Sequence, residues 1–248
     1  MKIIGIETSS IQGGVAVLET ERDSVILKKG ITLRRGLVHG KLLIPALDKL
    51  LKQARWKKNQ INLVVVDIGP GSYTGLRVGL AIAKTIAYAL KTMIIGVSSL
   101  DAILRNIGKS NDCRYVCPVT DARWNQVYTA VYEKTAAGYK RRTDYLAITP
   151  EDLVKLLNRY RGKILLTGDG LKTYGDVFRR LGGRAEFAPE RLWFPQAKNV
   201  ALLGYEAYNR GEQDDPIKLL PLYLRLTEAE MNLKYNKVVP TVVGIRHR

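Results

Sequence analysis

The first hundred residues alternate apolar runs with turn-forming residues, and this pattern predicts strands followed by helices. Three consecutive strands are expected at 2–7, 13–19 and 24–33. A helix is predicted at 39–54, because leucines recur there at helical spacing. Pro45 is expected in the first turn of that helix, or else to kink it. The elements expected next are strand 62–67, helix 73–90, strand 93–97 and a short helix at 99–107.

The second half repeats this order after a polar stretch at 109–112, which predicts a domain boundary. The expected elements are strands 114–120, 125–133 and 139–147, helix 150–160, strand 163–167, helix 170–181 and a last helix at 197–210. We therefore predict one lobe at 1–108, a second at 109–220, and a tail at 221–248. The end of the tail, 232–248, holds few apolar positions, so it is expected to be mobile or ordered by a partner.

Strand-strand-strand-helix-strand-helix, used twice, is the plan of the actin/hexokinase/Hsp70-type fold. The predicted fold class is therefore α/β, with two similar lobes that each hold a mixed sheet flanked by helices. The repeat is visible in the pattern of elements and not in sequence identity.

A glycine-rich stretch at 69–79 joins the predicted strand 62–67 to the helix 73–90. Its glycines allow a sharp turn and a close approach of backbone to a neighbour, and Ser72 or Thr74 can cap the helix. The stretch lacks the Gly-Lys-Ser/Thr of a P-loop, and Thr74 stands where the dinucleotide fingerprint needs glycine. As a phosphate-binding loop it is therefore a weak match.

Taken with other short segments, this stretch resembles the TsaB (YeaZ) family. The resemblance covers residues 3 to 225, in the order of the family's motifs. The matching segments are Ile3-Ile4-Gly5-Ile6-Glu7-Thr8-Ser9, His39 with Leu42-Leu43-Ile44-Pro45, the stretch 69–79, Gly96-Val97-Ser98-Ser99-Leu100, Asp121-Ala122-Arg123 and Pro221-Leu222-Tyr223-Leu224-Arg225.

The resemblance implies an accessory subunit that is not catalytic alone. It would bind and position the catalytic TsaD subunit, which threonylcarbamoylates the adenosine beside the anticodon of tRNA. A TsaE-type ATPase would join a larger complex, and tRNA would bind through that complex. Helices 39–54 and 73–90 would pair with TsaD, or form a homodimer when the chain is alone. The interface residues expected on this basis are Leu43, Leu47, Tyr73, Leu76, Arg77 and Leu80.

Several polar residues are candidates for a nucleotide site between the lobes. They are Glu7, Thr8, Ser9, Asp67, Asp121 and Asp169. One interpretation is an ATP–magnesium site, and the other is a set of turn formers and strand ends that bond locally. The resemblance implies a vestigial site with no required cofactor. The alternative function is an independent ATP-binding phosphotransferase or ATPase of this fold class.

The residue inventory does not support a metal centre. TsaD resembles TsaB in fold but carries a His-x-x-x-His metal motif, whereas this chain has only His39 and His247. The residue four positions after His39 is Leu43, which cannot bind a metal. Cys113 and Cys117 lack the spacing of a zinc pair and are expected as reduced thiols on a buried strand.

The chain is strongly basic, with 40 Lys and Arg against 23 Asp and Glu and a formal charge of +17. The excess of basic over acidic residues is densest between residues 28 and 58. One interpretation is contact with tRNA phosphates, and the other is general solvation of the surface. The candidate RNA contacts are Arg34, Arg35, Lys57 and Lys58. A pure RNA-binding module is the third functional possibility. No apolar run is long enough to cross a bilayer, and a cytoplasmic location is expected.

Overall fold

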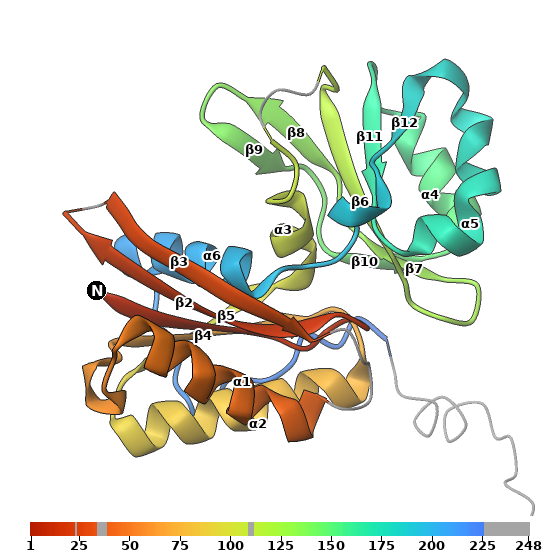
Figure 1. The fold of residues 1–248 in the computed structure, drawn as a ribbon. Coiled ribbons are helices and arrows are strands. Elements are labelled where there is room, and N and C mark those ends of the chain that lie inside the picture. The colour runs from red at the N-terminus through yellow and green to blue at the C-terminus, as the bar shows by residue number, and fades with distance from the viewer. Residues whose placement is uncertain (23, 34–38, 109–111, 226–248) are drawn as a thin grey trace, which may run out of the picture.

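The computed structural model describes residues 1–22, 24–33, 39–108 and 112–225. Two mixed sheets lie in separate halves of the molecule, each covered by helices, and the short helix α3 (Ser99–Leu104) lies between them (Figure 1). Arg34, Arg35 and the predicted tail end at 232–248 fall outside the described residues.

The first sheet has the strand order β3-β2-β1-β4-β5. Its first three strands form antiparallel pairs, whereas β1, β4 and β5 run parallel. Parallel neighbours require crossover connections, which α1 and α2 supply. The bounds are Lys2–Glu7 for β1, Gly13–Glu21 for β2, Ser24–Leu33 for β3, Leu63–Gly69 for β4 and Met93–Ser98 for β5.

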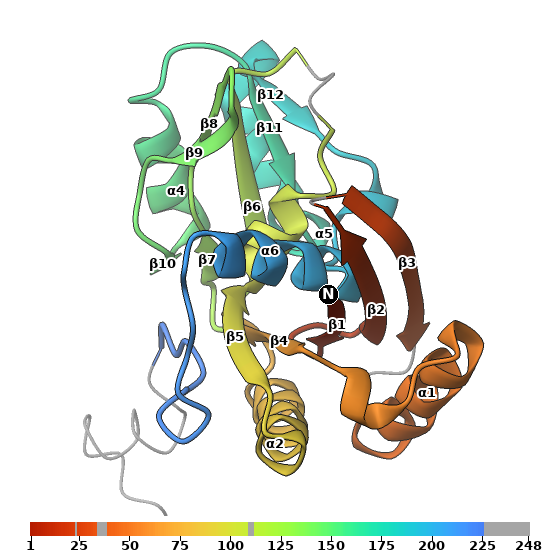
Figure 2. The same cartoon turned by 90° about the vertical axis from the view of Figure 1, so that its left-hand side faces the viewer.

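Helices cover both faces of this sheet. α1 (His39–Ala54) and α2 (Tyr73–Leu90) pack on one face, where Leu50 and Ala83 join a core with Ile4 and Val64. α6 (Ala197–Asn209) covers the other face (Figure 2). Dividing the chain at residue 108 would assign α6 to the second lobe, yet its buried residues pack on the first sheet. Pro45 lies inside α1 and not in its first turn.

The second sheet has the order β10-β7-β6-β11-β12, and β8 and β9 extend from β6. Two long strands predicted there, 125–133 and 139–147, are each divided in two. Each is divided where the neighbouring strand changes: β7 pairs with β10, whereas β8 pairs with β9. The bounds are Tyr115–Asp121 for β6, Val127–Thr129 for β7, Tyr132–Thr135 for β8, Gly138–Arg141 for β9, Leu146–Ile148 for β10, Ile164–Thr167 for β11 and Ala185–Phe187 for β12.

The helices of the second half cover its sheet in the same way. α4 (Pro150–Leu157) and α5 (Gly170–Phe178) bury Leu153 and Phe178 against β6 and β11. Among the described residues, short 3₁₀ helices lie at Arg179–Arg184 and Glu190–Leu192 in this half and at Lys58–Gln60 in the first half. Both halves therefore follow the predicted order of strands and helices, and the predicted α/β fold class is confirmed.

Two connections tie the halves together. Asp101 of α3 accepts hydrogen bonds from the hydroxyls of Tyr132 (2.5 Å) and Tyr145 (2.6 Å) in the second half. The strap, which we define as residues 214–225, runs along the first half, where Leu222 N donates to Ile68 O at 2.7 Å. It ends at the second half, where Arg225 Nη1 donates to the carbonyl of Arg123.

Candidate functional site

The glycine-rich stretch packs α2 directly onto the turn between β1 and β2. Ser72 caps the helix by accepting from Gly75 N at 3.2 Å, and Ser72 N donates to Ser9 O at 2.7 Å. A Cβ at Gly75 would lie 2.0 Å from Thr8 O, and one at Gly79 would lie 2.1 Å from Thr8 Oγ1. Only glycine fits at these contacts. The stretch therefore serves close packing of helix on turn, and the predicted cap at Ser72 is confirmed.

Two buried carboxyl groups meet beneath this contact. Glu7 is the last residue of β1, and Asp67 lies two residues before the end of the neighbouring parallel strand β4; both are fully buried. Ser9 Oγ lies 2.7 Å from Glu7 Oε1 and 2.9 Å from Asp67 Oδ2. A hydroxyl has one proton, so it donates to one carboxyl and accepts from the other, which must then be protonated. The geometry therefore calls for one shared proton.

The electrostatics of the pair agree with that geometry. Burial, followed by repulsion from Asp67, raises the pKa of Glu7 well above its usual value. Burial also raises the pKa of Asp67 to about 7, although Gly69 N donates to Asp67 Oδ1 at 2.7 Å and opposes the shift. Two carboxylates this close cannot both ionise without cost. Glu7 Oε2 and Thr8 Oγ1 have no hydrogen-bond partner among the described residues.

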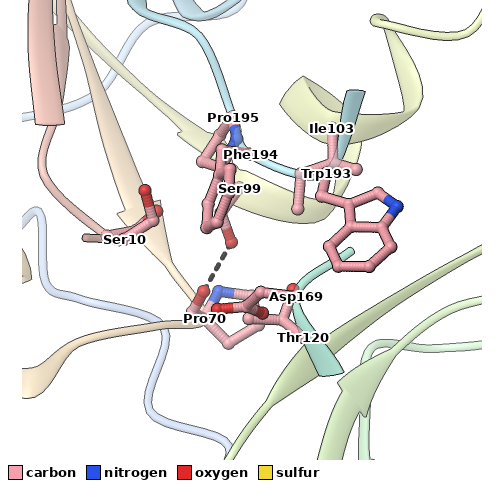
Figure 3. Close-up of a pocket in the computed structure, with 10 residues that line it drawn as sticks. Ser10, Pro70, Ser99, Ile103, Thr120, Asp169, Trp193, Phe194 and Pro195 are labelled. Carbon is pink, nitrogen blue, oxygen red and sulfur yellow. Dashed lines mark hydrogen bonds between the residues drawn. The ribbon is translucent and has the colours of Figure 1, made fainter. Parts of the chain in front are cut away.

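A small hollow lies beside the pair, between the two halves of the molecule (Figure 3). It has a volume of about 10 Å³, which is close to the minimum for one water molecule. Ser99 Oγ donates to Pro70 O at 2.5 Å on its wall, and Thr120 Oγ1 has no partner among the described residues. The lining residues are Ser9, Ser10, Pro70, Ser99, Ile103, Thr120, Asp169, Trp193, Phe194 and Pro195.

The structure brings together only part of the predicted nucleotide site. Ser9 and Asp169 line the hollow, and Asp121 N donates to Asp169 Oδ1 at 3.1 Å. Burial raises the pKa of Asp169. Glu7 and Thr8 lie behind the hollow, under α2. Ligand pockets for molecules of drug size span about 300–1,000 Å³, so the hollow as it stands is far too small for a nucleotide.

Sequence reasoning did not single out Thr120, Trp193 or Phe194 at this hollow. Thr120 immediately precedes the matched Asp121-Ala122-Arg123 segment, which is the signal that could have indicated it. Trp193 and Phe194 follow a 3₁₀ helix and reach the hollow only through the path of the chain between β12 and α6. No sequence pattern indicates that path.

Four residues expected at a partner interface lie in the chain's own core instead. They are Leu43, Leu47, Leu76 and Leu80, which pack against the first sheet and are at most 5% exposed. Their side chains are therefore not part of the exposed surface of α1 and α2. The other two expected residues, Tyr73 and Arg77, are exposed.

The outer faces of α1 and α2 present a different set of residues. On α2 the exposed positions Tyr73, Arg77, Ala81 and Tyr88 form a stripe at helical spacing. On α1 the exposed apolar residues are Leu42 and Ile44. The two helices approach at their starts, where a Cβ at Gly40 would lie 3.7 Å from Val78. We call this surface the α1–α2 face.

The candidate RNA contacts that the structure describes, Lys57 and Lys58, are exposed just after α1. Exposed Lys41, Lys49 and Arg55 extend the charge, while Asp48 pairs with Lys52 at 2.7 Å. Trp56 is buried and Lys2 Nζ lies 5.4 Å from the centre of its ring, so it offers no stacking surface.

Acidic, histidine and cysteine side chains are scattered over the described residues. Within the described ranges, no three Asp, Glu, His or Cys side chains converge as a metal site requires. Nor does that part of the chain contain a helix both long and apolar enough to span a bilayer. Cys113 and Cys117 are both buried; Cys117 lies on β6 as expected, whereas Cys113 lies two residues before that strand.

Comparisons with known proteins agree with these features. A family model described as TsaD, tRNA N6-adenosine threonylcarbamoyltransferase, matches residues 37–233. A Bacillus subtilis (strain 168) protein, described as tRNA threonylcarbamoyladenosine biosynthesis protein TsaB, is 31% identical over 231 residues, covering 93% of this chain and 96% of the relative. TsaB of Escherichia coli (strain K12) is 24% identical over 188 residues, covering 75% and 80%. The structure of YeaZ from Pseudomonas aeruginosa matches with a TM-score of 0.76 at 21% identity, covering 90% of this chain and 99% of that one.

The two-lobed fold, with α2 packed on the turn between β1 and β2, defines a protein of the actin/hexokinase class. Within that class, the chain belongs to the TsaB family, also called YeaZ. The resemblance drawn from short sequence segments is thereby confirmed.

Proposed function

We propose that the chain is an accessory subunit in the biosynthesis of tRNA threonylcarbamoyladenosine. In this role it binds and positions a TsaD-type catalytic subunit, which modifies the adenosine beside the anticodon. The names of its relatives place those proteins in this biosynthesis. A TsaE-type ATPase joins the same assembly, and tRNA is bound through it.

The observation that carries the proposal is the α1–α2 face. It combines apolar and aromatic residues with Arg77 on two neighbouring helices, which is the composition of a protein interface. Arg77 Nη1 donates to the Tyr73 hydroxyl at 3.2 Å, and its guanidinium lies 5.4 Å from the centre of the Tyr73 ring. The two side chains are thus held in place before a partner arrives. A second copy of the chain can use the same face when the partner is absent.

The hollow between the lobes supports a role without chemistry of its own. Its walls are formed by residues of both lobes, among them Pro70, Asp169 and Phe194, and its volume is that of about one water molecule. The rival function, an ATP-dependent phosphotransferase, needs this hollow to open. Titration of the chain with ATP–magnesium in a calorimeter separates the two functions.

Lys57 and Lys58 are proposed to touch tRNA once the complex has formed. Both lie exposed just after the end of α1, and Asp48 of that helix is already paired with Lys52. Lysines placed in this way add a salt-sensitive contribution to tRNA affinity without reading its sequence.

The test of the function is a reconstitution that omits one component at a time. Purified chain, TsaD-type subunit, TsaE-type ATPase, threonylcarbamoyl adenylate and tRNA are combined, and modified nucleoside is measured by mass spectrometry. We expect modification only when both this chain and the TsaD-type subunit are present. Full modification without the chain would overturn the proposal.

A further inference from the structure

A continuous row of aromatic and arginine side chains leads from the α1–α2 face to the second lobe. Arg77 lies over Tyr73, and the Tyr73 ring packs on Tyr223 of the strap with ring centres 5.2 Å apart. Two residues further along the strap, Arg225 Nη1 donates to Arg123 O at 3.1 Å in the turn between β6 and β7. Neighbouring residues of this row are either in direct contact or two positions apart along the strap.

The turn at the end of the row has an uncommon backbone. Three consecutive residues other than glycine have φ values in the left-handed region, which L-amino acids disfavour. They are Arg123 (62°), Trp124 (54°) and Asn125 (54°). The turn is fixed by several bonds at once: Gln126 N donates to Arg123 O at 3.1 Å, and Arg225 holds the same carbonyl. Strain retained in a well-bonded turn is typical of a functional position.

This turn presents Trp124 to solvent, with 68% of the residue exposed. Tryptophan, tyrosine and arginine are the residues that most often dominate binding energy at protein interfaces. A rigid turn lowers the entropy lost when such a side chain is buried by a partner. Trp124 is therefore well suited to act as an anchor in an apolar pocket of another protein.

We propose that the catalytic partner binds this whole row, so that its interface extends from α2 along the strap to Trp124 on the second lobe. This inference rests on the proposed function. The partner surface has an apolar pocket for Trp124 and a carboxylate that faces Arg77. Contact with both lobes fixes the orientation of the partner, which a single helix face does not.

The arginines and tyrosines of this row already have partners within the chain, which favours a protein over a strand of RNA as the bound molecule. Arg225 is used by backbone carbonyls, and Arg123 Nη1 lies 3.5 Å from the carboxylate of Asp121, which offsets its charge. The rings of Tyr73 and Tyr223 cover each other, so they do not offer open faces to bases. Single-stranded RNA sites depend on such open faces and on free cations.

The test compares four single variants of the full-length chain for binding to its cognate TsaD-type subunit by calorimetry. Trp124→Ala removes the anchor, Ala81→Glu blocks the α1–α2 face, and Phe187→Ala removes an exposed aromatic residue on β12 as the matched control. We expect Trp124→Ala to raise Kd at least tenfold and the control to change it less than twofold. Arg123→Ala is a second variant of the turn and is expected to raise Kd three- to tenfold.

The outcomes separate the two proposals. If wild type binds and Ala81→Glu weakens binding while Trp124→Ala and Arg123→Ala do not, the extended interface is wrong and the accessory role stands. If wild type does not bind at all, the proposed function itself fails. Loss of tRNA binding by Trp124→Ala, with partner binding unchanged, would assign the row to RNA and overturn this inference.

Discussion

Gly79 of α2 lies so close to Thr8 that a Cβ on Gly79 would stand 2.1 Å from Thr8 Oγ1. The turn between β1 and β2, which the sequence suggested as part of a nucleotide site, is thus packed directly against α2. The glycine-rich stretch therefore allows α2 to pack closely on the turn between β1 and β2. The exposed side of the helix carries Tyr73, Arg77 and Ala81, which belong to the proposed partner surface.

A test of this packing is the substitution Gly75→Ala. Alanine favours a helix over glycine by up to about 1 kcal/mol, but its Cβ would meet Thr8 O at 2.0 Å. The clash dominates, so we expect the free energy of unfolding to fall by about 1–3 kcal/mol. Urea denaturation measures the change.

Gly175→Ala is the matched control, because Gly175 also lies in a helix and a Cβ there would meet nothing within 4 Å. It is expected to raise the free energy of unfolding by about 0.5–1 kcal/mol. Equal effects of the two substitutions would show that packing against Thr8 is not what requires glycine.

The buried acid pair predicts a pH dependence of stability. Burial raises the folded-state pKa of Asp67 to about 7, whereas an unfolded Asp titrates near 4. Between these values the folded state binds more protons, so this contribution is complete below about pH 4 and is lost as the pH rises through about 7.

Asp67→Asn removes this titration and keeps an acceptor for Gly69 N. We expect its free energy of unfolding, relative to wild type, to rise by roughly 1–4 kcal/mol between pH 5 and pH 8. Urea denaturation at both pH values gives the difference, with exposed Asp144→Asn as the control. A wild-type profile that falls no more steeply than that of Asp67→Asn would argue against a shared proton.

The α1–α2 face is tested by Ala81→Glu. Ala81 is exposed at the centre of the α2 stripe, so a carboxylate there leaves the fold intact but is buried without a partner in the complex. We expect affinity for the TsaD-type subunit to fall at least a hundredfold with an unchanged melting temperature. Ala136→Glu, at an exposed turn between β8 and β9, makes the same change elsewhere and should have no effect on binding.

The basic surface is tested by the double substitution Lys57→Glu and Lys58→Glu, with tRNA affinity of the assembled complex measured at several salt concentrations. If both lysines face phosphates, the slope of log K against log salt becomes shallower by about 2. Lys172→Glu, an exposed site on α5, is the control. An unchanged slope for the double variant would indicate that these lysines only solvate the chain.

The sequence predicted the helices of the first lobe closely, because α1 and α2 combine leucine spacing with a cap at Ser72. It did not show which side of α2 faces the sheet, since small and apolar residues surround that helix. Leu76 and Leu80 were therefore expected at an interface although they fill the core. The sequence placed Glu7 and Asp67 in one candidate site, but it did not show that both reach the same Ser9 hydroxyl, because that contact depends on β1 and β4 being neighbours in the sheet.

The most direct test of the accessory role is size-exclusion chromatography with light scattering on the chain alone, on the cognate TsaD-type subunit alone and on the mixture. We predict a stable one-to-one complex at micromolar concentration that Ala81→Glu abolishes and Ala136→Glu preserves. Separate elution of the two wild-type proteins would contradict the account.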